Sequence, residues 1–237
     1  MSARRSLSIV IPAYNEAGNI LGTLENVRAA LAPLALDAEI IVVDDGSRDG
    51  TGALVDANVS HFPGVRLLVN ERNLGFGATY RRGVAATSRD HIVMVHGDNA
   101  WGAKTLSEFF SHVGDADIII GYTRDMWRSR PFMRTLISKT FTMLVNLITG
   151  RRLKYYNGLQ IHRADVLQSL TIQSSGHGFQ AEVLVKALRL TKTFIEVPMV
   201  LIEREHGESK AFRLKNAVDV LRTLKRLRGV ATEASVR

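Results

Sequence analysis

The sequence contains no cysteine, so it can form neither disulfide bonds nor a thiolate metal site. It also lacks long apolar runs. A membrane-spanning helix needs roughly 18 uninterrupted apolar residues, and the nearest candidate, 131–149, is interrupted by Arg134 and Lys139. The beginning of the given sequence has no apolar core of the kind that signal peptides carry. Together these absences lead us to expect a cytoplasmic protein.

Aromatic residues are scarce, at 7% of the chain, and they do not alternate with basic residues as base-stacking platforms would. We therefore expect no nucleic-acid partner. Acidic residues are scarce in two segments: residues 124–154 contain eight Lys or Arg and one Asp, and residues 208–237 contain eight Lys or Arg and three acidic residues. This distribution indicates an anionic partner, such as phosphate groups or acidic lipid headgroups; two solvated helix faces are the alternative.

The first half of the chain alternates between strand and helix patterns. Strands are predicted at 7–11, 39–43, 65–69, 92–95 and 117–121. Helices are predicted between them, at 20–31, after Asp49, at 75–86 and at 104–113. We expect Pro12 to end the first strand and Asn19 to cap the first helix. This alternation of strands and helices predicts an α/β fold with a doubly wound, mostly parallel sheet flanked by helices.

The second half is richer in helices. Apolar residues recur at helical spacing in 130–149, 179–190 and 211–227, and a strand pattern occupies 194–200. No internal repeat or low-complexity linker divides the chain, so we expect one domain over 1–237, with a frayed tail at 229–237.

Polar clusters follow three of the predicted strands. Tyr14-Asn15-Glu16 follows the first strand, Asp44-Asp45-Gly46-Ser47 the second, and His96-Gly97-Asp98 the fourth. Ligands of doubly wound sheets bind beyond the carboxyl ends of the strands, so these clusters are candidate binding residues. Taken alone, Asp-Asp-Gly-Ser is equally well explained as a turn that leads into a helix.

Seven segments occur in the order found in the inverting family-2 glycosyltransferases, which have the glycosyltransferase-A fold. They are Ile-Pro-Ala-Tyr-Asn-Glu (11–16), Val-Val-Asp-Asp-Gly-Ser-Arg-Asp-Gly-Thr (42–51), Asn-Leu-Gly-Phe-Gly (73–77), Gly-Tyr-Thr-Arg (121–124), Gly-His-Gly-Phe-Gln-Ala-Glu (176–182), Glu-Val-Pro (196–198) and Arg-Glu-His-Gly-Glu-Ser-Lys (204–210). The sequence resembles this family over 7–227. More narrowly, it is similar to the dolichyl- or polyprenyl-phosphate mannose or glucose synthases.

The resemblance implies a nucleotide-sugar-binding half at 1–122 and an acceptor-side half with amphipathic helices at 123–228. The residues that it implies for nucleotide-sugar binding are Pro12, Tyr14, Glu16, Val42, Asp44, Asp45, Gly97, Arg124, Arg204 and Lys210. The last three would contact the diphosphate or the phosphate of a lipid acceptor. Fixed cations at such a place stabilise the charge that accumulates on a leaving diphosphate, whereas surface ion pairs are the alternative for these three.

The family binds a divalent metal, Mn²⁺ or Mg²⁺, at an Asp-x-Asp motif after the fourth strand, where carboxylates carry the ion that bridges the diphosphate. In this sequence Asp98 matches the second aspartate and His96 replaces the first. Imidazole suits Mn²⁺ better than Mg²⁺. A site that prefers Mn²⁺, a site in which Asp98 alone contacts the metal, and donor binding without metal all remain open. His96 can also be a hydrogen-bonding residue beside the pocket.

Inverting transfer to a hydroxyl acceptor needs a general base, whereas a phosphate acceptor is already ionised. The candidate catalytic residues are Glu182, which the resemblance places on the acceptor side, and Asp98 near the donor. Glu182 can instead be the structural partner of an arginine. The loop 155–160 lacks the aspartate that the family usually carries there, so a saccharide or glycolipid hydroxyl stays open as the acceptor.

The expected function is transfer of a sugar from a GDP- or UDP-sugar to a lipid acceptor, with polyprenyl phosphate as the first expectation, at the cytoplasmic face of the membrane. The predicted helix at 130–149 has an apolar stripe and flanking arginines. Such a helix can lie in the interface of an anionic membrane, with about 1 kcal/mol of attraction for each basic residue, or it can pack in the core. A nucleotide-sugar-binding protein without turnover is the alternative from another class, and the replacement at His96 motivates it.

Overall fold

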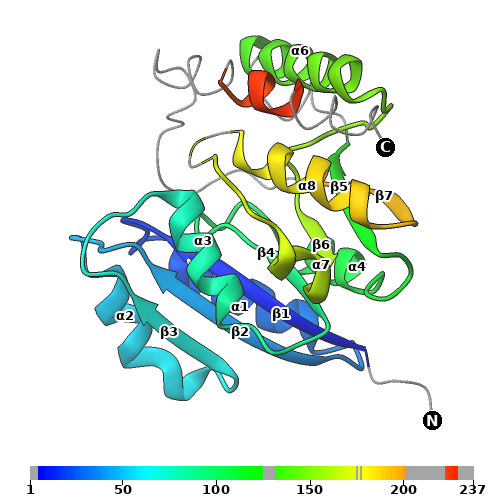
Figure 1. Ribbon diagram of the computed structural model, residues 1–237. Helices are drawn as coiled ribbons and strands as arrows, with labels where there is room; N and C mark the ends of the chain where they lie inside the picture. The colour runs from blue at the N-terminus through cyan, green and yellow to red at the C-terminus, as the bar shows by residue number, and fades with distance from the viewer. Residues whose placement is uncertain (1–4, 125–131, 175, 177, 201–221, 229–237) are drawn as a thin grey trace.

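A computed structural model describes residues 5–124, 132–174, 176, 178–200 and 222–228. Seven strands form one sheet in the order β3-β2-β1-β4-β6-β5-β7 (Figure 1). The strands are β1 (Ser6–Ala13), β2 (Asp37–Asp44), β3 (Val65–Val69), β4 (His91–Met94), β5 (Ile118–Thr123), β6 (Gln160–Arg163) and β7 (Phe194–Met199). All pairs are parallel except those that β6 makes with β4 and with β5. The prediction of a mostly parallel sheet is confirmed.

Helices cover both faces of this sheet, as a doubly wound fold requires. The described helices are α1 (Ile20–Leu31), α2 (Thr51–Asn58), the short 3₁₀ helix η1 (Val59–His61), α3 (Phe76–Ala85), α4 (Ala103–Phe110), α6 (Phe132–Thr149), α7 (Ala164–Ser169) and α8 (Phe179–Leu190). Residues 222–228 are helical as well. None of the helices in the described part of the chain is long and apolar enough to cross a bilayer.

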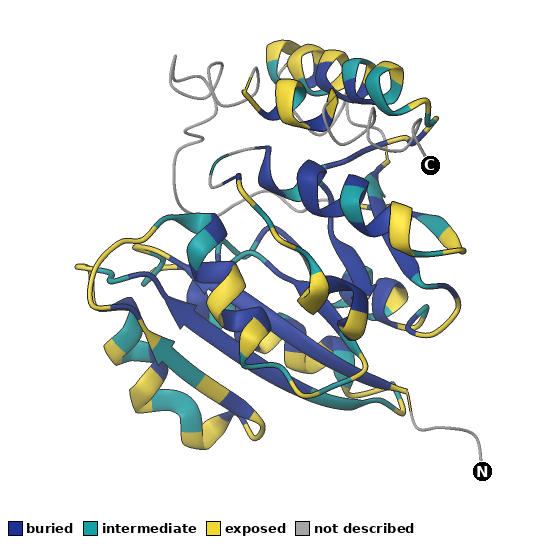
Figure 2. Ribbon diagram, in the orientation of Figure 1, coloured by how far each residue is buried: buried dark blue, intermediate teal, exposed yellow. Residues whose placement is uncertain are grey.

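Strands β1, β2 and β4 are mostly buried because they present apolar side chains to both layers of helices. In β1, Ile9 and Ile11 pack with α1 and α4 on one face, whereas Val10 packs with α3 and α8 on the other. This two-sided burial explains why the sequence at 39–43 shows almost no polar alternation. Figure 2 shows the result: dark blue strands lie between helices whose outer sides are exposed.

A third cluster joins the second half to the sheet. Ile118 and Ile120 of β5 pack with α8, and α6 lies over α8 through Phe141 and Val145 (Figure 1). The helix at 222–228 contributes Leu227 to the same cluster. Helices α8 and α6 thus form two successive layers over β5.

Two details differ from the sequence prediction. Strand β1 does not end at Pro12 but continues to Ala13, because a proline near the end of a strand removes only one ladder hydrogen bond. Asn19 occupies the N-cap position of α1, but its side chain donates to Glu16 Oε2 at 2.8 Å and makes no capping hydrogen bond. Asp49 does accept from the backbone N–H of Thr51, the first residue of α2, at 3.0 Å.

Three short elements were not predicted at all: η1, β6 and α7. Strand β6 is short and contains only Ile161 as an apolar residue, and α7 has six residues. The predicted helix at 211–227 lies mostly outside the described residues; its end, from 222, is helical. The tail at 229–237 also lies outside them.

Candidate active site

The three polar clusters meet at one edge of the sheet. Strands β2, β1 and β4 are adjacent and parallel, so the loops that follow them leave the sheet side by side. The loop after β1 begins at Tyr14, the loop after β2 at Asp45, and the loop after β4 at Val95. The prediction that these clusters share the carboxyl edge of the sheet is confirmed.

Side-chain hydrogen bonds join the first two loops. The backbone N–H of Asn15 donates to Ser47 Oγ at 2.9 Å, and Asn15 Oδ1 accepts from the backbone N–H of Arg48 at 2.9 Å. The backbone N–H of Glu16 donates to Thr51 Oγ1 at 2.9 Å. Asn15 has a φ of +56°, in the left-handed region that asparagine tolerates better than most residues. The two loops therefore form one unit.

The adjacent carboxylates of this unit have different surroundings. Asp45 is 3% exposed and accepts from the backbone N–H groups of Leu74 and Gly75, at 2.8 and 2.9 Å, and from Asn70 Nδ2 at 2.8 Å. Because Gly75 is the N-cap of α3, Asp45 fixes the loop at 70–75 and lies at the positive end of that helix dipole.

The two oxygens of Asp44 have different neighbours. Its Oδ1 accepts from the backbone N–H and the hydroxyl of Ser47, whereas no described residue donates to Oδ2. The residue is 4% exposed, and its Oδ2 lies against α2, where the absence of a side chain at Gly52 makes room for it, since a Cβ there would lie 2.6 Å from Oδ2. Asp45 thus holds the loop beside it, and the binding role of Asp44 stays a prediction.

The other residues implied by the resemblance occupy varied positions around this unit. Tyr14 is 37% exposed at the edge of the sheet. Glu16 is partly exposed, and Pro12 lies within β1. Val42 is completely buried in the core, so in this conformation its side chain presents no surface to a ligand. The binding roles of all four stay predictions.

The loop after β4 is held by polar residues of α1. Thr23 Oγ1 donates to the carbonyl of Gly97 at 3.1 Å and accepts from the backbone N–H of Asn99 at 3.1 Å. Asn26 Nδ2 donates to Asn99 Oδ1 at 2.8 Å. A Cβ at Gly97 would lie 3.3 Å from the carbonyl oxygen of Pro12, so glycine lets this loop approach β1. The sequence prediction missed Thr23 and Asn26; a threonine within the apolar stripe of α1 was the only signal.

His96 and Asp98 lie in this loop, and both are partly exposed. The His96 ring stacks on Phe76, with 5.3 Å between ring centroids and 11° between the planes. Within the described part of the chain, no three His, Cys, Asp or Glu side chains gather as a metal cluster. One carboxylate and one imidazole are a fitting donor set when substrate phosphates complete the coordination. His96 and Asp98 could therefore hold a divalent ion together with a diphosphate.

On the acceptor side, Glu182 of α8 is 1% exposed and surrounded by donors. It accepts from Lys186 Nζ at 2.6 Å and from the backbone N–H groups of Gln173 and Ser174 at 3.1 and 2.8 Å. Burial raises the pKa of Glu182, but the hydrogen bonds from Lys186 and Ser174 outweigh burial and hold the pKa below its usual value. The partner is thus a lysine and not an arginine, and the catalytic role of Glu182 stays a prediction.

The three predicted phosphate-binding cations can be placed only in part. Arg124 follows β5 at the carboxyl edge of the sheet, is exposed, and donates its backbone N–H to the carbonyl of Met199 at 2.9 Å. Arg204 and Lys210 lie outside the described residues.

Solved structures of two enzymes have a similar fold. Mannosyl-3-phosphoglycerate synthase from Rubrobacter xylanophilus superposes with a TM-score of 0.75 over 94% of this chain and 74% of its own, at 16% identity. Glucosyl-3-phosphoglycerate synthase from Mycobacterium tuberculosis, solved with Mg²⁺ and UDP, superposes with a TM-score of 0.71 over 95% of this chain and 80% of its own, at 21% identity. At these identities the likeness shows the fold alone, and it confirms the nucleotide-sugar transferase fold that the sequence predicted.

Sequence relatives are closer. An undecaprenyl-phosphate mannosyltransferase from Micrococcus luteus is 31% identical over 211 residues, which cover 85% of each chain. A polyprenol monophosphomannose synthase from Mycolicibacterium smegmatis is 30% identical over 214 residues, covering 85% of this chain and 79% of its own. The family model described as glycosyl transferase family 2 matches residues 8–167, which include all three loops at the carboxyl edge. The chain belongs to glycosyl transferase family 2, as the motifs in its sequence predicted.

Proposed function

We propose that this protein transfers a sugar, with inversion, from a nucleotide-diphosphate sugar to polyprenyl phosphate. The observation that carries the proposal is the carboxyl edge of the sheet, where Asp44 at the end of β2 and the loop with His96 and Asp98 after β4 lie on either side of the parallel strand β1. The two mannosyl-transferring relatives, whose names specify undecaprenyl phosphate and polyprenol, support the acceptor.

In this proposal Asp44 accepts a hydrogen bond from the nucleoside of a GDP- or UDP-sugar, and Tyr14 and Glu16 flank it. Asp45 acts indirectly, because its carboxylate is engaged by the loop at 70–75. Gly97 lets the β4 loop approach the strand that carries Tyr14.

His96 and Asp98 would hold a divalent cation against the diphosphate. When bound, such an ion neutralises the charge that develops on the leaving group. The pairing of imidazole with carboxylate favours Mn²⁺ over Mg²⁺. Similar folds have been solved with UDP and either ion, which supports a metal here.

The acceptor step needs little from a base, because a phosphate is already ionised near neutral pH. Glu182, with both oxygens engaged by donors, is consistent with that chemistry. Arg124, exposed at the carboxyl edge beyond β5, would contact the diphosphate or the phosphate of the acceptor.

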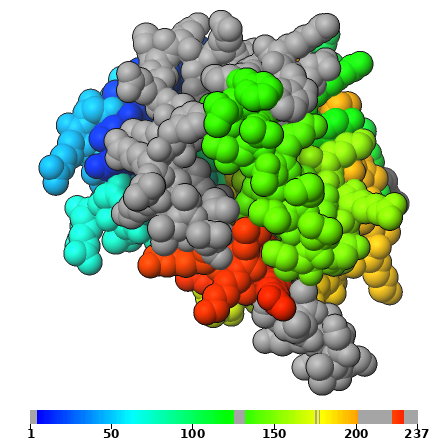
Figure 3. Space-filling model, turned by 90° about the horizontal axis from the view of Figure 1, so that it is seen from above, coloured from blue at the N-terminus to red at the C-terminus, as the bar shows by residue number. Residues whose placement is uncertain are grey.

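We also propose that α6 docks on the cytoplasmic face of an anionic membrane. Six of its large apolar side chains are exposed: Phe132 65%, Met133 54%, Leu136 43%, Ile137 52%, Met143 55% and Leu147 72%. Two of its threonines, Thr135 and Thr142, are buried instead. Residues 132–154 include five Lys or Arg and no acidic residue. Figure 3 shows this surface, with α6 in green beside the red helix at 222–228.

A nucleotide panel tests the proposal. Thermal unfolding would be followed with GDP-, UDP- and dTDP-sugars, each with Mg²⁺, Mn²⁺ or a chelator, because a ligand of the native state raises the transition temperature. We expect one nucleotide to stabilise the protein, more strongly with Mn²⁺ than with Mg²⁺. A protein that no nucleotide stabilises contradicts the proposal.

Product analysis then distinguishes the acceptors. With the stabilising donor, we expect a glycosylated polyprenyl phosphate and little product from saccharide or glycolipid hydroxyls. If product formed only on a saccharide or glycolipid hydroxyl, that hydroxyl and not polyprenyl phosphate would be the acceptor. Binding of the donor without any product would support the non-catalytic alternative.

A further inference from the structure

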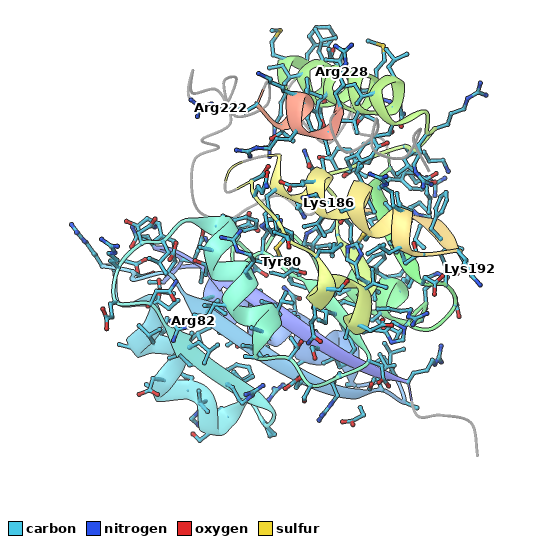
Figure 4. The ribbon with its side chains drawn as sticks, in the orientation of Figure 1. Tyr80, Arg82, Lys186, Lys192, Arg222 and Arg228 are labelled. Carbon is cyan, nitrogen blue, oxygen red and sulfur yellow. The ribbon has the colours of Figure 1, made fainter. Side chains whose placement is uncertain are left out.

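Three aromatic side chains connect His96 to the helices on the acceptor side. Phe76 stacks on His96, and Phe179 meets Phe76 edge-on, with centroids 6.0 Å apart and planes at 89°. Tyr80, labelled in Figure 4, projects from α3 and meets Phe179 in the same manner at 5.4 Å and 88°. Such edge-to-face contacts are the preferred geometry of aromatic pairs.

Phe76 itself is held at a fixed point. It is the first residue of α3, directly after Gly75, whose φ is +87° and whose backbone N–H donates to Asp45. Phe179 is the first residue of α8. The Phe76 ring is thus held by Phe179 of α8 and by its own position at the start of α3.

The stacked geometry suits a metal ligand. The lone pair with which an imidazole binds a metal lies in the plane of the ring, so a neighbour on the ring face leaves it available. A neighbour at that position also fixes the plane in which the lone pair points. The orientation of a metal-binding histidine is usually fixed by a hydrogen bond from its other ring nitrogen. A ring stacked on the imidazole constrains the same plane, and a rotated imidazole would lose its bond to the metal.

Histidine needs this orientation more than aspartate does. A carboxylate offers two equivalent oxygens over a wide range of angles, whereas an imidazole offers one nitrogen in one direction. A ring that fixes the plane of the imidazole therefore matters more at His96 than it would beside an aspartate.

We propose that Phe76 is a positioning residue that orients His96 as a metal ligand, with Phe179 holding Phe76 in place. The inference rests on the proposed metal at His96 and Asp98, and it assigns to Phe76 a role that acts through His96 and not through the substrate.

The first test needs no metal. In the stacked arrangement the ring current of Phe76 shifts the imidazole protons of His96 upfield in the proton NMR spectrum. These signals are identified as those missing from His96→Asp. We expect Phe76→Leu to move them toward the positions of an unstacked histidine and Phe76→Tyr to leave them upfield.

The second test measures Mn²⁺ affinity by electron paramagnetic resonance, in the presence of the nucleotide diphosphate that stabilises the wild type. We expect Phe76→Leu to weaken Mn²⁺ binding on the order of tenfold, and Phe76→Tyr to restore it. Phe62→Leu is the matched control, because Phe62 is a buried phenylalanine in the cluster on the opposite face of the sheet and should leave the affinity unchanged.

The decisive comparison introduces Phe76→Leu into the His96→Asp variant. There, Phe76→Leu should cause no further loss of Mn²⁺ affinity, because the carboxylate does not need the stack. Equal losses in both backgrounds, or an unchanged affinity after Phe76→Leu despite the loss of the ring-current shift, would overturn the positioning role. If the wild type bound no Mn²⁺ with any nucleotide, the proposed metal site itself would be wrong. Circular dichroism identifies any variant that fails to fold.

Discussion

The adjacent aspartates Asp44 and Asp45 carry the same functional group but accept hydrogen bonds from different partners. Asp45 accepts from three donors of the loop at 70–75, whereas Asp44 accepts through Oδ1 from Ser47 and its Oδ2 has no donor among the described residues. We expect Asp45→Asn to lower the free energy of unfolding by about 2 kcal/mol, because an amide nitrogen would face N–H donors. Urea unfolding measures this change.

Asp44→Asn should instead abolish stabilisation by the nucleotide at little cost to folding. If Asp44→Asn destabilised the fold and Asp45→Asn abolished stabilisation by the nucleotide, the roles assigned to the two aspartates would be wrong.

Glu182 gives a prediction for pH. Its pKa in the folded state lies below its usual value of 4.5, so its ionised form contributes stability above that value, and the contribution is lost as the pH falls through the folded pKa. We expect the free energy of unfolding of the wild type to fall more steeply below about pH 4.5 than that of Glu182→Gln. Near neutral pH the variant should be less stable by on the order of 2 kcal/mol.

Glu108→Gln, at an exposed position of α4, is the matched control and should keep the wild-type pH dependence. Parallel pH profiles for the wild type and Glu182→Gln would show that the ionised carboxylate of Glu182 does not stabilise the fold.

At the scale of elements, α1 supports the β4 loop through Thr23. Thr23→Val keeps the shape of the side chain but removes both hydrogen bonds to the loop. We expect a loss of about 1 kcal/mol in stability and weaker Mn²⁺ binding at His96 and Asp98. Thr142→Val is the control, because the Thr142 hydroxyl bonds only within α6, to the carbonyl of Ser138. If both variants bind Mn²⁺ as the wild type does, α1 does not organise the site.

Helix α6 gives a prediction about membrane binding. We expect Met143→Ser combined with Leu147→Ser to reduce co-sedimentation with phosphatidylglycerol vesicles while the thermal stability stays close to that of the wild type, because both side chains are exposed. Lys139→Ala should weaken binding roughly fivefold, as a loss of about 1 kcal/mol implies.

Leu190→Ser on α8 is the control for α6, since Leu190 is 60% exposed and lies on another helix. Vesicles of phosphatidylcholine alone should bind the wild type weakly. Equal sedimentation of the wild type and the double variant would show that α6 does not contact the membrane.

At the scale of the whole molecule, the sequence predicted most of the sheet because two-sided burial leaves a strong pattern: the run at 39–43, with almost no polar alternation, became the interior strand β2. It did not predict β6, because Gln160 and His162 are polar residues that the sheet buries. Their burial depends on partners distant in the chain, which a local pattern does not contain.

The candidate site was predicted unevenly for the same reason. The motifs identified its loops, since strand ends determine where loops emerge. They did not separate Asp44 from Asp45, because the donors that engage Asp45 come from residues 70–75. Thr23 and Asn26 were not predicted because their contacts with the β4 loop depend on the fold. Phe76 lies in the family segment 73–77, but its contact with His96 could not be predicted from that segment.

The antiparallel strand β6 has a consequence for how the chain assembles. Strand β5 follows β4 in the sequence, yet β6 separates them in the sheet. The four strands β3-β2-β1-β4 can therefore pair while the rest of the chain is still being synthesised, but β5 and β7 must wait for β6. In refolding followed by pulsed hydrogen exchange, we expect amides of β1 and β2 to be protected before those of β5. The part of the sheet made of β3, β2, β1 and β4 would thus form first, and β6, β5 and β7 would then pair onto it.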